Sequence, residues 1–404
     1  NIGGLISMKS DKTTPNVPTL RFPNYNGEWQ KTVMGKVCSF RKGYGIAKDD
    51  LSSDGTPCIL YGELYTTYKT AIAKTIKSKT SLQSKSLVYS QKDDVIIPCS
   101  GETAEDIATS ICVPYDGILL GGDLTIVHSD LDGAFLSNQI NSVRKYDIAR
   151  IAQGKSIVHL QADELKKIFI FYPSIQEQRK ISAFIDKIDE RIEIQNKIIS
   201  KYETLIKGIY HEFFSKPADY AIKIKDLIIK GKSGGTPSST VARYYNGDIP
   251  FLSISDMTKQ GKYVSYTEKH ISKSGIENSS AWIVPSNSLI FSMYASVGLV
   301  CINTVPLATS QAMFSMVLKD RRMIEYIYYY LNFFRETKIH RHIETGTQSN
   351  INAETVRNID IPFQSNHLKL VETLNSIEKR LNNEKDMLSL LLDLKAYLLS
   401  KLFI

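Results

Sequence analysis

The sequence contains no apolar stretch long enough to cross a membrane and has little cysteine. A membrane-spanning helix needs about 18 or more consecutive apolar residues, and no such run is present. The cysteines are odd in number and include no Cys-x-x-Cys pair: Cys38, Cys58, Cys99, Cys112 and Cys301. This usage argues against a disulfide framework and a structural zinc site, and it indicates a reducing compartment. Because no signal peptide is visible either, we expect a cytoplasmic chain.

The sequence also lacks the residue sets that common enzyme classes require. Residues 231–233 (Gly-Lys-Ser) resemble the end of a phosphate-binding loop, but Asp226 stands where that loop needs its first glycine. Residues 121–123 (Gly-Gly-Asp) are too short for a dinucleotide fingerprint and are interpreted as a turn. No cysteine or carboxylate set completes a metal site around His340 and His342, which are the closest histidines. We therefore predict no catalytic and no metal-binding residues in this chain.

The composition is that of an ordinary globular protein with a basic excess. Hydrophobic residues make up 42% and charged residues 23% of the 404, so two or three domains with sizeable cores can form. The formal net charge of +8 is compatible with a polyanionic partner, although solubility explains it equally well. Residues 1–19 show no apolar periodicity, and we expect a flexible N-terminal segment there.

A heptad pattern occurs twice, 189 residues apart. The first copy has apolar residues at alternating steps of four and three between positions 181 and 213, and the second between 370 and 402. A polar residue interrupts both copies at the same heptad position, Gln195 and Glu384, and Lys395 interrupts the second copy once more. The residues assigned to the seam between the two helices are Ile181, Ile185, Ile188, Ile192, Ile199, Leu370, Leu374, Ile377, Leu381 and Leu388. Such a narrow stripe favours a helix as the partner, so we predict two long helices packed on each other in antiparallel coiled-coil fashion. Packing of each helix on its own globular domain is the alternative.

A mixed segment precedes each predicted helix. Short β-rich runs alternate with Gly, Ser and Asp turns in both segments, and strands are predicted at 94–98, 288–292 and 312–318 among others. A helix is predicted at 323–335. The edges of the segments resemble each other, for instance 29–37 and 220–228, whereas the interiors diverge. We therefore predict an α/β (α+β) fold class with a pseudo-twofold internal repeat. The predicted parts are domains at 20–173 and 217–362, each followed by a long helix, at 174–216 and 363–404.

Several motifs are similar to those of type I restriction-modification specificity subunits. Residues 20–23 (Leu-Arg-Phe-Pro) with Trp29 resemble the start of that family's target-recognition domain. Residues 172–181 (YPSIQEQRKI) resemble its junction into the central long helix, and residues 234–238 (GGTPS) resemble a loop near the start of a recognition domain. The second junction, residues 362–367, lacks the Glu-Gln pair, and the first domain has residues 41–45 (RKGYG) in place of the GGTPS loop. The resemblance covers residues 20–404, including the repeat.

The resemblance implies a non-catalytic DNA-reading subunit. Each target-recognition domain would read one half of an asymmetric bipartite DNA site, and the helix pair would set the unread spacer. The implied partners are double-stranded DNA, two adenine-methylating modification subunits docked along the helices and, optionally, restriction-translocation subunits. S-adenosylmethionine, ATP and Mg would then belong to those partner chains. No methyltransferase tetrapeptide or methyl-donor loop is recognisable in this chain.

Candidate DNA-contacting residues lie in Gly/Ser-rich loops in which basic and aromatic residues are interleaved, as is typical of contact loops. In the first domain they are Arg41, Lys42, Tyr44, Tyr65 and Lys69. In the second domain they are Lys230, Lys232, Ser233, Thr236, Ser238, Arg243, Tyr244, Tyr245, Gln348 and Asn350. The tyrosine-rich run 326–330 is interpreted as a packed helix face. Two other functions remain open at this point, a stand-alone endonuclease with fused recognition domains and a coiled-coil scaffold that binds no DNA.

Overall fold

The computed structural model describes residues 16–152, 158–294, 296–342 and 350–404, and the chain forms two compact units. Unit 1 comprises the chain up to Lys197 together with Asp386–Ile404, and unit 2 comprises Ile198–Lys385. Each unit holds one mixed α/β domain and a segment of each of two long helices, α7 (Ile175–Phe214) and α13 (His367–Leu402). The predicted fold class, with two long helices in a repeated arrangement, is confirmed.

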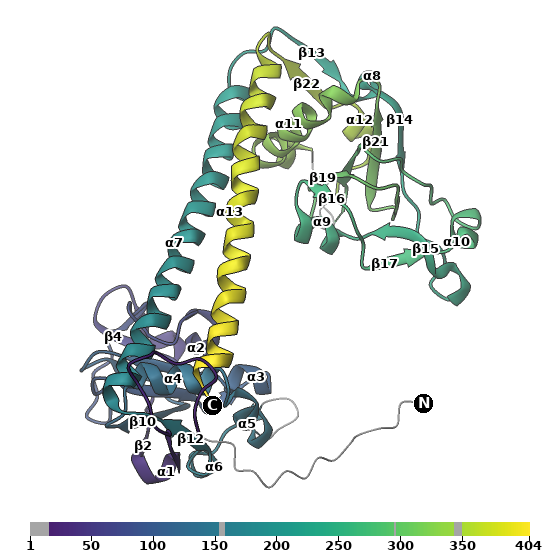
Figure 1. Ribbon diagram of the computed structural model, residues 1–404. Coiled ribbons are helices and arrows are strands. Elements are labelled where there is room, and N and C mark those ends of the chain that lie inside the picture. Colours follow the sequence, from purple (N-terminus) through teal and green to yellow (C-terminus); the bar gives the residue numbers. More distant parts are fainter. Residues whose placement is uncertain (1–15, 153–157, 295, 343–349) are drawn as a thin grey trace. The chain divides into compact units, whose positions relative to one another are not determined.

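The two long helices run antiparallel within each unit (Figure 1). In unit 1 the first part of α7 packs on the last part of α13, where Ile181 and Ile185 share a cluster with Leu398 and Leu402. In unit 2 the later part of α7 meets the first part of α13, and Lys385 Nζ lies 2.9 Å from Glu203 Oε1. Among the predicted seam residues, Ile181, Ile185, Ile188, Ile199, Leu370, Leu374 and Leu381 are buried, and Ile192, Ile377 and Leu388 are half-buried.

The domain of unit 1 is built on the antiparallel sheet β2-β10-β6-β8. The strands of this sheet are β2 (Cys38–Lys42), β10 (Leu124–Ser129), β6 (Asp94–Pro98) and β8 (Ile111–Val113). Smaller sheets are formed by β1 (Gln30–Val33) with β12 (Phe169–Tyr172), by β7 (Ser100–Gly101) with β11 (Val158–His159), and by β3 (Leu51–Ser52), β5 (Ser78–Thr80), β4 (Thr56–Ile59) and β9 (Leu119–Leu120). The helices are α1 (Met34–Val37), α2 (Glu63–Thr66), α3 (Ala104–Ile107), α4 (Gly133–Asn141), α5 (Lys145–Ile151) and α6 (Ala162–Leu165).

The domain of unit 2 repeats this plan with the sheet β14-β21-β18-β19-β16. Its strands are β14 (Ile228–Ser233), β21 (Met313–Leu318), β18 (Ser288–Ser292), β19 (Val300–Asn303) and β16 (Tyr263–Val264). Smaller sheets are formed by β13 (Tyr220–Lys223) with β22 (Asp360–Phe363), and by β17 (Lys269–Ile271), β15 (Tyr245–Leu252) and β20 (Ala308–Thr309). The helices are α8 (Ile224–Leu227), α9 (Ile254–Gln260), α10 (Lys273–Glu277), α11 (Ile324–Thr337) and α12 (Ala353–Arg357).

The middle residues of β6 and β18 are buried on both faces of their sheets, which explains why they are apolar. Successive side chains of a strand point to opposite faces. In β6, Val95 and Ile97 join one core cluster and Ile96 joins another. In β18, Leu289 lies in one cluster and Ile290 in a second one. The strands predicted at 94–98, 288–292 and 312–318 and the helix predicted at 323–335 are confirmed, with ends shifted by at most two residues.

The aromatic run on α11 is a packed helix face, as predicted. Tyr326, Tyr329 and Tyr330 are each at most 3% exposed and contribute to the largest core cluster of unit 2. The histidines at 340 and 342 are exposed. In the described part of the chain, every helix is too short or too polar to cross a bilayer.

The junction motifs have a structural role in unit 1. Arg21 donates two hydrogen bonds to the carboxylate of Glu177, from Nε and Nη2, each 2.8 Å long. Gln178 donates from Nε2 to the Pro173 carbonyl and accepts from the Asp132 amide at 3.0 Å. Glu177 is 1% exposed, so its two hydrogen bonds with Arg21 fix the start of α7 against the N-terminal segment. The two motifs that resemble the family therefore contact each other.

Candidate nucleic-acid interface

The loops that follow β2 and β14 are structurally equivalent, although their sequences differ. Gly43 donates its backbone hydrogen bond to the carbonyl of Leu124, and Gly234 donates to that of Met313, which lies 189 positions later. The next residues repeat the relation, because Tyr44 donates to Leu120 and Gly235 to Thr309. Residues 41–45 and residues 232–236 thus occupy the same place in the two domains.

Close backbone approach explains the glycines in both loops. A Cβ added at Gly43 would overlap the carbonyl oxygen of Gly121, and a Cβ added at Gly234 would overlap that of Thr309. Only a residue without a side chain fits such a contact. The Gly-Gly pair at 121–122, predicted to be a turn, is therefore the partner of the contact loop in unit 1.

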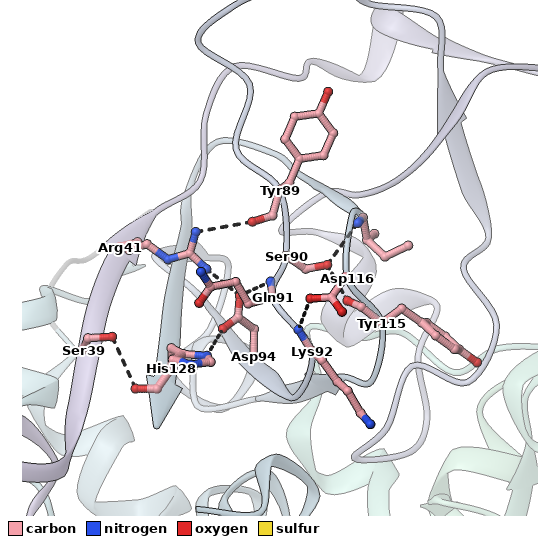
Figure 2. Close-up of polar contacts among 11 residues, drawn as sticks. Ser39, Arg41, Tyr89, Ser90, Gln91, Lys92, Asp94, Tyr115, Asp116 and His128 are labelled. Atoms are coloured by element: carbon pink, nitrogen blue, oxygen red, sulfur yellow. Dashed lines mark hydrogen bonds and ion pairs between the residues drawn. The ribbon is translucent and has the colours of Figure 1, made fainter. Parts of the chain in front are cut away.

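A buried carboxylate organises the polar face of the unit 1 sheet (Figure 2). Asp94 at the start of β6 is fully buried, and its Oδ2 lies 2.6 Å from Arg41 Nη2 on β2. Its Oδ1 lies 2.8 Å from His128 Nδ1 on β10. The backbone amide of Gln91 donates a hydrogen bond to Asp94, and Arg41 donates one to the backbone carbonyl of Tyr89. These five residues form the Asp94 set.

This arrangement presents two hydrogen-bonding groups side by side. The side chains of Arg41 and His128 remain 36% and 39% exposed, so both reach solvent while Asp94 holds their orientation. Among the described residues, no hydrogen-bond partner is found for the Nε2 atom of His128. A guanidinium and an imidazole fixed on adjacent strands form a preorganised surface for phosphate oxygens or base edges.

The other predicted contact residues of unit 1 do not form one cluster with Arg41. Lys42 and Tyr44 are exposed at the end of β2 and in the loop after it. Tyr65 is half-buried on α2, and burial is the main cause that raises the pKa of its phenol. Lys69 lines a groove of about 600 Å³ together with Asp186 and Glu190 of α7, and none of the Asp94 set lines that groove.

In unit 2 the predicted loop is held against a second segment that contains Trp282. Lys230 Nζ lies 4.2 Å from the centre of the Trp282 ring, and Lys232 Nζ donates to the Ser280 carbonyl at 3.2 Å. Thr236 Oγ1 donates to Gln311 Oε1 at 2.5 Å. The residues of β14 and its loop therefore share one polar surface with Trp282 and Gln311.

The remaining predicted residues of unit 2 stabilise the loop itself or lie elsewhere. Tyr245 donates to the Pro237 carbonyl, Arg243 lies over the Tyr244 ring, and Ser238 bonds Thr240. Ser233 pairs with Phe314 within the sheet. Asn350 forms an antiparallel bridge with Tyr294. Gln348 lies outside the described residues.

Sequence reasoning missed four residues of these surfaces: Asp94, His128, Trp282 and Gln311. A signal for Asp94 was present, because a carboxylate that begins an otherwise apolar strand (DVIIP) requires a buried cationic partner. No comparable signal existed for the other three, since their positions depend on which strands become neighbours.

The comparisons with known proteins agree with this two-domain organisation. The family model described as "Type I restriction modification DNA specificity domain" matches residues 26–204 and again residues 219–387. The chain belongs to this family. The two matches cover most of the sequence, and each includes one α/β domain with the first part of the helix that follows it.

Individual members of the family show the same similarity at lower coverage. The specificity subunit of the MjaIX type I restriction enzyme of Methanocaldococcus jannaschii is 28% identical over 42% of this chain. The HindI specificity subunit of Haemophilus influenzae is 32% identical over 45%. The chain spans about two fifths of the length of these relatives, 40% and 43%. The crystal structure of a type I specificity subunit from M. genitalium has the same fold, with a TM-score of 0.57 at 16% identity, over 96% of this chain and 99% of that one.

Proposed function

We propose that the chain is the DNA sequence-specificity subunit of a type I restriction-modification enzyme and that it carries out no catalysis itself. Residues 20–173 and 217–362 are the proposed recognition domains, each of which reads one half of a bipartite site. The helix segments 174–216 and 363–404 set the spacer between the halves and bind the modification subunits. S-adenosylmethionine, ATP and Mg are assigned to partner subunits.

The observation that carries this proposal is the repeated loop with different side chains. The hydrogen bonds of Gly43 and Gly234 make the two contact loops equivalent. By strand register, Arg41 then corresponds to Lys232, and Asp94 and His128 correspond to Ser288 and Val317. The two domains share one backbone arrangement but carry different side chains at the equivalent positions. They would therefore recognise two different DNA half-sites, so the proposed site is asymmetric.

An exposed apolar stripe on α13 supports the docking of a partner protein. Met387, Leu390, Leu394 and Tyr397 are spaced by three, four and three residues and therefore share one face of the helix. These side chains are 46% to 63% exposed within unit 1. A contiguous apolar stripe of this kind is typical of a protein–protein interface. The proposed occupant is a modification subunit.

Mapping of methylated adenines tests the proposal directly. Cells that express this chain together with its modification subunit should gain methylation at one new motif with two unlike halves and a fixed gap. Neither chain alone should produce the motif. If the pair produces no motif, while a control specificity subunit does so with its own partner, the proposal is wrong. Steep salt dependence of duplex binding by the complex would separately exclude a scaffold without DNA affinity.

A further inference from the structure

A lysine in unit 2 joins the recognition domain to the long helix that follows it. Lys262 comes directly before β16, and its Nζ lies 2.6 Å from Glu378 Oε2 on α13 and 3.3 Å from Glu325 Oε1 on α11. It also donates to the Tyr329 hydroxyl at 2.9 Å, and Asn375 Oδ1 lies 3.4 Å away. The Lys262 side chain is only 9% exposed.

The surroundings of Lys262 compensate a buried positive charge. Two carboxylates face the ammonium group, and the Tyr329 ring lies 4.4 Å from it, which adds a cation–π contact. Burial opposes ionisation of Glu325, but hydrogen bonds from Tyr263 and Asn375 and the charge of Lys262 together lower its pKa. Removal of this lysine would leave two carboxylates close together without a cation.

Unit 1 contains a similar contact between a lysine of the domain and the helix that follows it. Lys74 Nζ lies 2.6 Å from Asp186 Oδ1 and 3.0 Å from Glu190 Oε1, both on α7. The two lysines do not occupy the same place in the repeat, because the backbone carbonyls of Ala71 and Lys262 accept the equivalent hydrogen bonds, from the amides of Cys112 and Ile302. The unit 1 version is more open, because the Lys74 side chain is 43% exposed.

Both contacts lie well beyond the start of the helix. Asp186 follows the first residue of α7 by 11 positions, and Glu378 follows the first residue of α13 by 11 positions. At 1.5 Å per residue this is about 16 Å along the axis. A domain attached only where its last strand enters the helix could rotate about that junction, whereas a second attachment about 16 Å away prevents rotation.

We infer that Lys262 and Lys74 are positioning residues that fix each recognition domain on the helix following it, so that the complex discriminates between spacer lengths. This inference rests on the proposed function, because a spacer matters only if both domains read DNA. Neither lysine is among the groups assigned to DNA contact. Each is expected to affect the tolerance of spacer changes more than the binding of one half-site.

The test uses the full chain assembled with its modification subunits and duplexes that carry the motif obtained by methylation mapping. Three duplexes are compared, with the natural spacer and with one base pair added or removed, and a fourth carries only the half-site read by unit 2. The variants are Lys262→Met and the charge-balanced triple variant Lys262→Met/Glu325→Gln/Glu378→Gln. Lys259→Met is the matched control. Lys259 lies three positions before Lys262, is exposed and pairs only with Glu268 among the ion pairs of the described residues.

Both variants without Lys262, here called the anchor variants, should show a roughly tenfold smaller preference for the natural spacer over the altered ones. Their affinity for the single half-site should be unchanged. The control should keep the full preference. An unchanged preference in both anchor variants would overturn the inference. A parallel loss of half-site affinity in both would also overturn it, since the lysine would then serve folding alone. Failure of the proposed function is distinguishable, because the unmodified complex would then bind none of the duplexes specifically.

Discussion

Lys395 of α13 and Asp189 of α7 form an ion pair inside the helix pairing of unit 1, with Nζ and Oδ1 2.5 Å apart. Their side chains are 18% and 9% exposed. Lys395 occupies a heptad position that is otherwise apolar, so the pair accounts for a polar interruption in the predicted stripe. Burial raises the pKa of Asp189 and the charge of Lys395 opposes that shift. A buried polar pair of this kind favours one alignment of two helices over others.

Replacement of Lys395 by Met should destabilise unit 1, because it leaves the Asp189 carboxylate buried without its cation. We expect a loss of about 2 kcal/mol in the free energy of unfolding, less than for a fully buried pair because both groups retain some exposure. Urea unfolding of the full chain measures it. The double variant Asp189→Leu/Lys395→Leu should recover most of the loss. Equal stability of Lys395→Met and the unmodified chain would contradict this account.

The acid side of the stability profile should depend on Glu336. Burial opposes its ionisation, but hydrogen bonds from His211 and Lys207 outweigh burial and lower the pKa of Glu336 below its ordinary value of 4.5. The folded state therefore binds fewer protons than the unfolded state. The contribution of Glu336 to stability is fully present above about pH 4.5 and is lost as the pH falls through the lower folded value.

The measurement compares the unmodified chain with Glu336→Gln between pH 6 and pH 3. The difference in unfolding free energy should be below about 1 kcal/mol at pH 6, because the pair is partly exposed, and it should shrink with acidification. Glu372→Gln, which removes an exposed carboxylate on α13, is the control. A difference that grows as the pH falls would refute the assignment.

Two glycine substitutions should have opposite effects. Gly234→Ala places a Cβ against the Thr309 carbonyl and should lower stability by about 1–3 kcal/mol through overpacking. Gly208→Ala lies within α7, where nothing stands within 4 Å of the new Cβ, and should raise stability by roughly 0.5–1 kcal/mol. Thermal unfolding of both variants checks the signs. A neutral Gly234→Ala would show that the loop shifts without cost.

The Asp94 set should determine DNA affinity in unit 1. Arg41→Ala should weaken duplex binding by the assembled complex and reduce the slope of log affinity against log salt by about 1, if the guanidinium meets a phosphate. A loss confined to the cognate half-site would instead assign it to a base edge, at about 1–3 kcal/mol. His128→Ala should act in the same direction. His159→Ala, an exposed histidine of the same unit, is the control, and equal binding by all variants would exclude this surface.

The repeat can be derived from the amino-acid sequence alone, because periodicity is a local property. The apolar steps of four and three between 181 and 213 specify a helix with one narrow face, whatever surrounds it. The recurrence of that pattern 189 residues later specified the pseudo-twofold chain order. The β-rich run at 94–98 likewise predicted a strand, and β6 is buried throughout.

Which distant side chains come into contact depends on the tertiary fold. Arg41, Asp94 and His128 are separated by 53 and 34 positions and come together because β2, β10 and β6 are neighbours in one sheet. The equivalence of residues 41–45 (RKGYG) with residues 232–236 (KSGGT) does not follow from their sequences, since it consists of backbone hydrogen bonds from Gly43 and Gly234 to matching strands. Lys262 likewise gives no local signal, because its partners come from α11 and α13. Side-chain identity and periodicity are encoded locally, whereas a contact between distant residues exists only once strand order and helix pairing have placed them together.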